Sequence, residues 1–379
     1  MKKIYLFLFL LLCIPFCVSA EELIPNADSG ILIEASTGKI IYEKEKDKEV
    51  AIASMTKMVS QILIFEAIES GKISTSDIVT VSRNAADMGG SQIYLSEGEN
   101  ISVDDLIKGI SIASGNDATV AMAEYIAGSE EKFVSMMNQK VKDMGLKHTH
   151  FVNCTGLDEE GHYSSAYDMG MIARELIVKH PDILKYSSIY EDYLREDTEN
   201  RFWLVNTNKL IRFYEGADGL KTGHTDAAGY CLAATAVRND IRMIGIVLGE
   251  ADSKVRNKET MDFLDYGFLN THRKILKKTG SVVKKIKMDK ADHEIIQIVV
   301  KNPLQVILDS NEDVEYRYEY DIADLELPIK RGDVVGKVHA YWKNQEVSNS
   351  DLTVLENISK KSFLSIYSQT LLDMITGTY

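Results

Sequence analysis

A serine and a lysine stand three positions apart in the stretch 53–57, ASMTK. The stretch opens a run, 55–71, whose apolar residues recur at helical spacing, so we expect Ser54 at the N-terminal end of a helix, as a candidate N-cap. Residues three apart on a helix share a face, with Cβ atoms about 5–6 Å apart, so the Lys57 amine can reach the Ser54 hydroxyl. A serine at a helix start is most often only a cap. The pair is nevertheless a candidate nucleophile with its base.

Two short motifs follow in a fixed order and strengthen that hypothesis. Ser114-Gly115-Asn116 stands where a predicted helix, 103–113, ends. Its glycine is expected to stop the helix and let the backbone turn. Lys221-Thr222-Gly223 comes directly after the turn residues 216–219, which should deliver it onto an edge strand.

The residue types in these motifs suit acyl transfer from a peptide. A lysine accepts a proton from serine only when it is neutral, and lowering its pKa from about 10.4 to about 7–8 requires roughly 3–5 kcal/mol of destabilisation of the charged form. Burial and a neighbouring cation cause such shifts, and Lys221 is the candidate cation. Asn116 can hold the Lys57 amine and a substrate amide. Ser114 can relay a proton to the leaving amine. Lys221 can also bind a substrate carboxylate, with the Thr222 hydroxyl beside it.

An oxyanion would need two backbone N–H groups. The candidates are that of Ser54 and that of the residue after Gly223, which is His224. His224 could instead be the base of a Ser-His-Asp triad, but Lys57 is already placed for that role and Asp226 is the one evident orienting carboxylate. Other histidines are interpreted as surface or loop residues, among them His148, His150 and His162.

The N-terminal twenty residues have the composition of a secretory signal. Lys2 and Lys3 precede an apolar run, 4–16, and small residues suited to a signal peptidase end the segment. A retained membrane helix is the competing interpretation, although the run is short for a span. The chain of 379 residues carries a net charge of −14, and cleavage would make it more acidic. This charge argues against nucleic acid as a partner.

Four cysteines are present, and two of them, Cys13 and Cys17, would leave with the signal. Cys154 and Cys231 remain, either bridged or as two thiols, which is too few for a disulfide scaffold. No spacing of Cys, His or carboxylates indicates a metal site, and the serine chemistry described above needs no cofactor.

Residues 21–272 are expected to form an α+β catalytic domain, an antiparallel sheet covered by helices. An N-terminal hairpin, 29–33 with 39–42, and a second one, 229–237 with 241–248, supply strands. Residues 186–212 have no clean period. Helices are predicted at 55–71, 103–113, 117–127, 132–144, 169–178 (capped by Ser165) and 254–267.

The pattern changes past residue 275. Short alternating runs separated by turns predict a small all-β domain over 276–357, with strands at 282–288, 294–300, 305–308, 314–320 and 334–342. Residues 359–377 read as an amphipathic helix too short and polar to span a bilayer. This helix could lie in a membrane interface or pack on protein.

The chain resembles a known family, the exported D-alanyl-D-alanine carboxypeptidases, which are low-molecular-mass penicillin-binding serine peptidases. The resemblance rests on the three motifs and on the stretches 88–92, 112–118, 162–164 and 218–225, and it spans about residues 24–270. It implies acylation at Ser54, activation by Lys57, Ser114 with Asn116 as second motif, and Lys221 as the substrate-binding lysine. Arg201 and Arg256 fall where the family has arginines near the substrate carboxylate.

The resemblance also implies a substrate, inhibitors and a location. The substrate would be peptidoglycan stem pentapeptides losing their terminal D-alanine, with β-lactams as inhibitors. The enzyme would work on the outer face of the cytoplasmic membrane, with possible peripheral contact through the C-terminal helix.

Three rival functions share parts of this pattern. A class A β-lactamase has the same trio, and Glu196-x-x-x-Asn200 matches its deacylation string, but this string lies close to Lys221 rather than midway between the second and third motifs. An endopeptidase that cuts wall cross-links would use the same residues. A non-catalytic wall-binding protein would carry a damaged motif, and none is damaged here.

Overall fold

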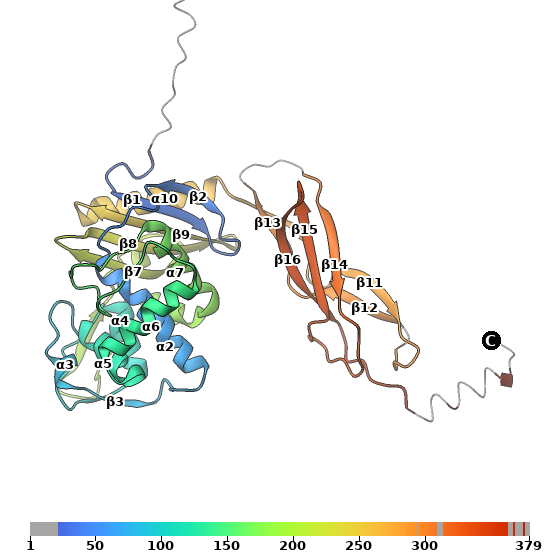
Figure 1. Cartoon of the computed structure of the whole chain (residues 1–379), viewed down its shortest axis with the longest axis horizontal. Helices are drawn as coiled ribbons and strands as arrows, with labels where there is room; N and C mark the ends of the chain where they lie inside the picture. Colours follow the sequence, from blue (N-terminus) through green and yellow to red (C-terminus); the bar gives the residue numbers. More distant parts are fainter. Residues whose placement is uncertain (1–21, 294, 309–313, 363–366, 368–373, 376–379) are drawn as a thin grey trace, which may run out of the picture.

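The structure is a computed structural model that describes residues 22–293, 295–308, 314–362, 367 and 374–375. Figure 1 shows a larger part of mixed helices and strands and a smaller part made of strands. The predicted signal, 1–20, lies outside the described residues, and so does most of the predicted C-terminal helix, 359–377.

A five-stranded antiparallel sheet forms the centre of the larger part, in the order β2-β1-β9-β8-β7. Both predicted hairpins are present, and the motif 221–223 lies on the edge strand β7, as predicted. The β8–β9 turn places Asn239 and Asp240 at φ 51° and 59°, the left-handed region that tight hairpin turns use. The strands are β1 (Ser29–Glu34), β2 (Ile40–Lys44), β7 (Ala217–Thr225), β8 (Gly229–Arg238) and β9 (Ile241–Glu250).

Both faces of this sheet are buried, so its strands read as nearly continuous apolar runs. Along β1, Ile31 and Ile33 join the main core, while Leu32 points into a second core. The second core is covered by α10 (Ser253–Leu269), and the main core by a helical layer. That layer consists of α2 (Lys57–Glu69), α4 (Val103–Ile112), α5 (Asn116–Ala127), α6 (Glu130–Asp143) and α7 (Ala166–Lys179).

The helix predictions are confirmed to within a few residues, with one correction at the N-terminal end of α2, where Ser54 and Lys57 lie. Residues Ala53–Thr56 form a 3₁₀ turn, η1, and the α-helix begins only at Lys57. Ser54 is therefore not an N-cap, because it lies inside the turn and Ile52 holds the cap position. Ser165 does cap α7, accepting the Asp168 N–H at 3.2 Å.

The stretch without a clean period holds small elements that the sequence did not resolve. A hairpin of β5 (Glu191–Leu194) and β6 (Phe202–Val205) projects from this stretch. The remaining short elements of the larger part are β3 (Ile78–Thr80), α3 (Arg83–Ala86), β4 (Asn100–Ser102), η2 (Pro181–Ile183), α8 (Leu184–Ser187) and α9 (Leu210–Phe213).

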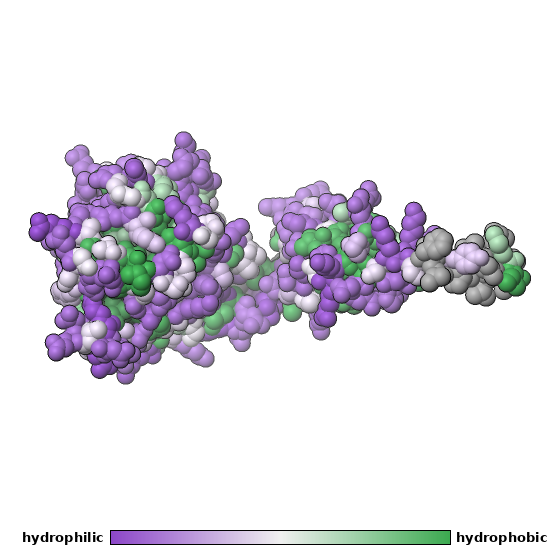
Figure 2. All heavy atoms as spheres, turned by 90° about the horizontal axis from the view of Figure 1, so that it is seen from below, coloured by the Kyte–Doolittle hydropathy of each residue, from purple (hydrophilic) through white to green (hydrophobic). Residues whose placement is uncertain are grey.

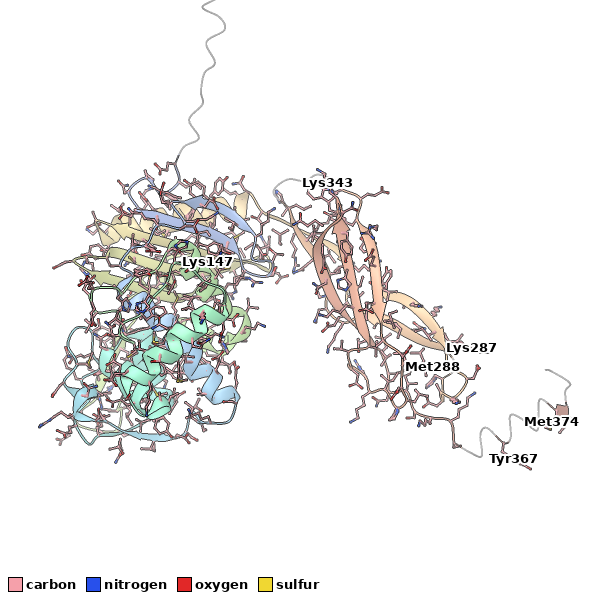
Figure 3. All side chains as sticks on the ribbon, in the orientation of Figure 1. Lys147, Lys287, Met288, Lys343, Tyr367 and Met374 are labelled. Atoms are coloured by element: carbon pink, nitrogen blue, oxygen red, sulfur yellow. The ribbon has the colours of Figure 1, made fainter. Side chains whose placement is uncertain are left out.

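The smaller part is built of strands, as expected. Its five-stranded sheet has the order β11-β12-β16-β15-β14, and β10 pairs with β13 beside it. Two strands were missed, β10 and β16, because their sequences are mostly polar or basic. Lys343 and Lys287 lie at opposite ends of this part (Figure 3). The strands are β10 (His272–Lys277), β11 (Val282–Lys287), β12 (Ile295–Val300), β13 (Leu304–Leu308), β14 (Arg317–Ile322), β15 (Gly336–Trp342) and β16 (Gln345–Val354).

Hydrophilic side chains cover most of the face drawn in Figure 2, with apolar side chains visible between them on each part. Within the described residues, no helix combines the length and the apolar character needed to cross a bilayer.

Two buried glutamates join the chain start to the sheet and α10. Glu250, at the end of β9, is fully buried, and Glu259 on α10 is 5% exposed. Asn26 donates to Glu259 through its backbone and side-chain nitrogens. Within the described part of the chain, three of the four carboxyl oxygens have no donor if both groups are ionised. Because a hydrogen bond to Glu259 is among the causes that raise the pKa of Glu250, we infer that Glu250 is protonated and donates to Glu259.

This pair predicts a stability that falls as pH rises. Burial, and then Glu259, raise the pKa of Glu250 from its ordinary 4.5 to about 8, while Lys44 and Arg256 oppose the rise. Between those values the folded state holds a proton that the unfolded state releases, so up to about 1.4 kcal/mol is lost per pH unit. Glu250→Gln keeps the donor at every pH, so its unfolding free energy should exceed that of the parent increasingly from pH 5 to 8.

The measurement is urea unfolding followed by Trp203 fluorescence in a Trp342→Phe background, since the chain has 2 tryptophans. Glu215→Gln, at an exposed position of the same part, is the control and should track the parent. If the unfolding free energies of the parent and Glu250→Gln change with pH in parallel across this range, the shared proton is contradicted.

Candidate active site

Lys57 is the centre of a buried polar cluster. Its Nζ lies 2.8 Å from Ser54 Oγ, 2.6 Å from Asn116 Oδ1 and 2.8 Å from the Thr155 carbonyl oxygen. Asn116 is oriented by its own amide nitrogen, which donates to the Gly89 carbonyl at 2.7 Å, so its oxygen faces the lysine. The structure thus brings together the first motif and the asparagine of the second, as the sequence predicted.

The protonation state of Lys57 follows from its burial. The side chain is fully buried, and burial lowers its pKa to about 7, against a smaller raising effect of Cys154 and Asp117. The expected contribution of Lys221 to this shift is not found among its causes. A neutral amine has two N–H donors and one lone pair. Since Asn116 Oδ1 and the Thr155 carbonyl can only accept, the lone pair is left for the Ser54 hydroxyl.

Lys221 lies across the site on β7. Its Nζ donates to Ser114 Oγ at 2.8 Å and to the Thr222 carbonyl at 3.1 Å, and the side chain is 1% exposed. Burial first, then Lys57 and Arg256, lower the pKa of Lys221 well below its ordinary value. The Thr222 hydroxyl donates to Thr207 Oγ1 at 2.7 Å. The second and third motifs are therefore in direct contact through Ser114.

The turn at the second motif differs from expectation in which residue takes the unusual conformation. Ser114 has φ 64°, whereas Gly115 has φ −56°. A non-glycine residue in the left-handed region is uncommon and is found at functional sites. Gly115 is needed for space instead, because an added Cβ would lie 2.9 Å from Asp117 Oδ1.

Two glycines let backbone segments approach the serine turn. A Cβ on Gly223 would lie 2.6 Å from the Ile52 carbonyl oxygen, so β7 packs directly against the residue that precedes η1. A Cβ on Gly156 would lie 1.9 Å from the Ala53 carbonyl oxygen, and Gly156 itself has φ 87°. Neither position admits any larger residue without moving the backbone around Ser54.

The remaining predicted residues differ in how near they lie to the lysines. Arg256 on α10 is buried, donates to the Cys231 carbonyl at 3.4 Å, and is close enough to depress the pKa of Lys221. Arg201 is exposed and stacks on the Tyr193 ring at 3.7 Å, within the β5–β6 hairpin. His224 is exposed, and its ring lies 4.0 Å from that of Tyr230.

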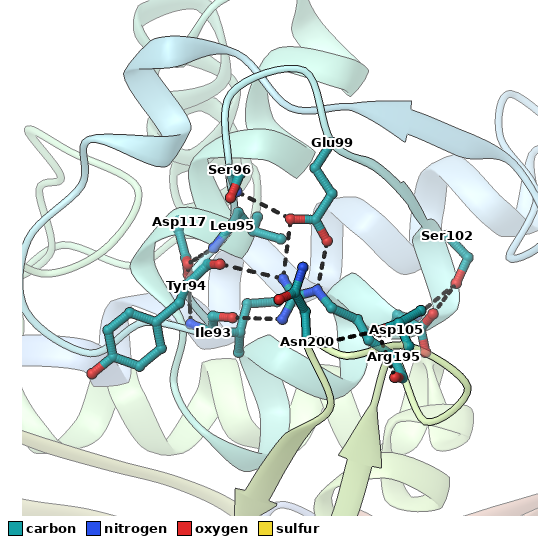
Figure 4. Close-up of polar contacts among 11 residues, drawn as sticks. Ile93, Tyr94, Leu95, Ser96, Glu99, Ser102, Asp105, Asp117, Arg195 and Asn200 are labelled. Carbon is teal, nitrogen blue, oxygen red and sulfur yellow. Dashed lines mark hydrogen bonds and ion pairs between the residues drawn. The ribbon is translucent and has the colours of Figure 1, made fainter.

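The loop before the second motif is fixed by two charged residues that the sequence did not single out (Figure 4). Asp117, fully buried, accepts the N–H groups of Ile93 and Leu95 at 3.0–3.1 Å. Arg195 donates to the Ile93 carbonyl at 3.1 Å and forms a two-pronged ion pair with Glu99. These bonds hold the wall of the site next to Asn116.

His162, expected to be a surface or loop residue, lies in a loop but is buried. It is 8% exposed, and its Nε2 lies 2.7 Å from Thr56 Oγ1. Burial lowers its pKa to about 4, so the ring is neutral near pH 7. Its place in the stretch 162–164, which carries part of the family resemblance, was the one signal in the sequence.

Other open expectations also have outcomes. Cys154 and Cys231 are both free and buried, so the bridge is not formed. Glu196 and Asn200 are exposed in the β5–β6 turn, whereas the Lys57 amine contacts Ser54, Asn116 and Thr155.

Known proteins match this chain over nearly its whole length. Residues 17–252 match the model of a family described as D-alanyl-D-alanine carboxypeptidase, and residues 271–360 match that of the penicillin-binding protein 5 C-terminal domain. D-alanyl-D-alanine carboxypeptidase DacF of Bacillus subtilis (strain 168) is 44% identical over 355 residues, covering 93% of this chain and 91% of that protein.

Solved structures agree with the sequence matches. A peptidoglycan synthesis regulatory factor (PBP3) from Streptococcus pneumoniae superimposes with a TM-score of 0.76 at 28% identity, over 88% of this chain and 99% of the other. Penicillin-binding protein D2 from Listeria monocytogenes, in its ampicillin-bound form, matches 64% of this chain and 98% of its own at 31% identity, with a TM-score of 0.58.

Asp117→Asn should loosen the loop wall, and it also removes a charge that raises the pKa of Lys57. The substitution removes charge-assisted acceptance from two backbone N–H groups, each worth about 1.5–3 kcal/mol, so thermal unfolding should shift down by several degrees. Glu97→Gln is the control, because Glu97 in the same loop is exposed and pairs with exposed Arg83. Equal melting temperatures for the two variants in differential scanning calorimetry would show that Asp117 does not hold this loop.

Proposed function

The chain belongs to the D-alanyl-D-alanine carboxypeptidase family, and from this premise we propose how its own residues carry out the reaction. The protein is a serine-type D-Ala-D-Ala carboxypeptidase that acts on peptidoglycan and binds penicillin. The observation that carries the residue assignment is the contact of the buried Lys57 amine with Ser54 Oγ at 2.8 Å.

The first half of the reaction is acylation. Ser54 Oγ attacks the carbonyl carbon between the two D-alanines while its proton passes to the neutral Lys57 amine. The C–N bond then breaks, and the terminal D-alanine leaves with the proton that Lys57 took up, which Ser114 passes to the amine nitrogen. The N–H groups of Ser54 and His224 stabilise the oxyanion of the tetrahedral intermediate. In the second half, water attacks the ester and restores the Ser54 hydroxyl.

A substrate carboxylate would favour the charged form of Lys221. Burial first, and then Lys57 and Arg256, hold its pKa down, and a substrate carboxylate placed beside it would raise that pKa again by direct attraction. A ligand with a free C-terminal carboxylate is therefore selected by its own charge. Arg256, which is buried nearby, adds to the positive potential at this end of the site, with Thr222 and Gly223 lining it. Arg201 is assigned to the same carboxylate from the resemblance alone.

The location of the enzyme follows from its substrate, because peptidoglycan lies outside the cytoplasmic membrane. We further propose that residues 1–20 are a cleaved signal and that 359–377 attach the mature enzyme to the outer face of that membrane. Support for the attachment is the apolar face in the sequence of that segment.

The assignment of Ser54 as nucleophile predicts a variant without activity. Ser54→Ala should lose both penicillin labelling and D-alanine release, because Ser54 Oγ is the hydroxyl that contacts the Lys57 amine among the described residues. The measurements are the intact mass of the mature protein after penicillin and free D-alanine from a diacyl-Lys-D-Ala-D-Ala peptide. Ser76→Ala, at an exposed serine, should retain both activities. An adduct on Ser54→Ala would move the nucleophile elsewhere, and fast penicillin hydrolysis by the parent would favour a lactamase.

The base assignment predicts an acid limb in the pH profile. Lys57, with its pKa lowered to about 7, is a base only when deprotonated, so kcat/KM should fall about tenfold per pH unit below 7 and level off above it. Steady-state D-alanine release between pH 5 and 9 measures this. A profile that stays flat down to pH 5 would exclude Lys57 as the base.

A further inference from the structure

The peptide unit that joins Ala53 to Ser54 is held from its carbonyl side. Ala53 has φ 47°, a left-handed conformation in a residue with a Cβ. In a trans peptide plane the C=O of one residue and the N–H of the next point in opposite directions. Whatever fixes the Ala53 carbonyl therefore also aims the Ser54 N–H.

Two contacts fix that carbonyl. The Thr56 hydroxyl, fully buried, donates to the Ala53 oxygen at 2.9 Å. The α-carbon of Gly156 packs against the same oxygen so tightly that a Cβ there would lie 1.9 Å away. The carbonyl is thus gripped by a hydrogen bond and blocked by backbone.

The direction of the Thr56 hydroxyl is set by His162. A hydroxyl has one hydrogen, and that hydrogen is used on the Ala53 oxygen, so the 2.7 Å contact with His162 Nε2 requires the imidazole to donate. The other ring nitrogen, Nδ1, accepts the Val152 N–H at 3.2 Å. Every donor and acceptor in this chain of bonds is satisfied by one neutral tautomer.

We propose that His162 is a positioning residue for the oxyanion site: through Thr56 it holds the Ala53–Ser54 peptide so that the Ser54 N–H faces the reacting carbonyl. The inference rests on the proposed oxyanion role of that N–H. It assigns to a histidine and a threonine a share in stabilising the transition state, although neither touches substrate.

The hydrogen bonds from His162 to Thr56 and from Thr56 to the Ala53 carbonyl, here called the relay, act on the transition state and not on substrate binding. A misaimed oxyanion donor loses stabilisation where negative charge develops. A ground-state ligand that keeps a trigonal carbonyl gains little from that donor. This difference separates positioning from mere support of the 149–164 loop, which would affect both states alike.

The test compares variants that break the relay with variants that keep it. Thr56→Val keeps the shape of the side chain and removes the hydroxyl, and His162→Leu removes the donor. Thr56→Ser and His162→Gln retain a hydroxyl and an N–H donor respectively. We expect the first two to lower kcat, and the rate of acylation by penicillin, by tenfold to a hundredfold with KM unchanged. The conservative pair should stay within threefold of the parent.

A tetrahedral inhibitor gives the decisive readout. Affinity for a peptidyl boronic acid, which adds to Ser54 and mimics the oxyanion, should fall in Thr56→Val by the same factor as kcat. In a Ser54→Ala background, the Kd of the uncleaved peptide should not change on adding Thr56→Val. His150→Gln, at an exposed histidine of the same loop, is the control and should match the parent in each assay.

The outcomes separate the inference from the function it rests on. Full kcat in a folded Thr56→Val, or equal losses for peptide and boronic acid, would overturn the relay while leaving the carboxypeptidase intact. If Thr56→Val fails to fold, Thr56→Ala takes its place as the variant without a hydroxyl, and its kcat should be lower than that of Thr56→Ser; equal kcat values would overturn the proposal. A parent enzyme that forms no penicillin adduct would refute the proposed function itself.

Discussion

The removal of one lysine from water is the constraint on which the site depends. Lys57 carries its amine into a region where the charged form is disfavoured. Two of its contacts, Asn116 Oδ1 and the Thr155 carbonyl, accept hydrogen bonds and cannot donate. Burial lowers the pKa of Lys57 to about 7, so a neutral amine is available near neutral pH, and the two acceptors then direct its lone pair to the serine. The ability of Lys57 to act as a base near pH 7 is therefore a consequence of how it is packed.

The same constraint accounts for much of the surrounding fold. Asn116 is useful only if its amide oxygen faces the lysine, and the Gly89 carbonyl fixes this orientation. Four residues further along the same segment, Asp117 and Arg195 bind the backbone of Ile93. On the other side, Gly223 brings the edge strand against the serine turn. These contacts fix the groups that surround the buried amine.

How far the sequence predicts this arrangement depends on the range of the signal. The central sheet, its helices and the pairing of Ser54 with Lys57 follow from local periodicity and spacing, and Lys221 was correctly placed on an edge strand. The site wall was not predictable in this way. Asp117 and Arg195 look like ordinary charged residues, and their partners lie 22–24 and 102 positions away in the chain. The burial of His162 was not foreseen for the same reason, since it depends on loops packing together.

Conformation of single residues was the other limit of prediction. The sequence assigned the turn of the second motif to Gly115, because glycine adopts left-handed backbone at no steric cost. The structure gives that conformation to Ser114 and uses the glycine for clearance. The same arrangement occurs at the first motif, where Ala53 is left-handed and Gly156 supplies the space around its carbonyl. At both serines of the site, a side chain is aimed by a strained backbone while a separate glycine admits the neighbouring segment. Strain of this kind persists only when the surrounding contacts over-determine it, and the hydrogen bond from Thr56 to Ala53 is such a contact.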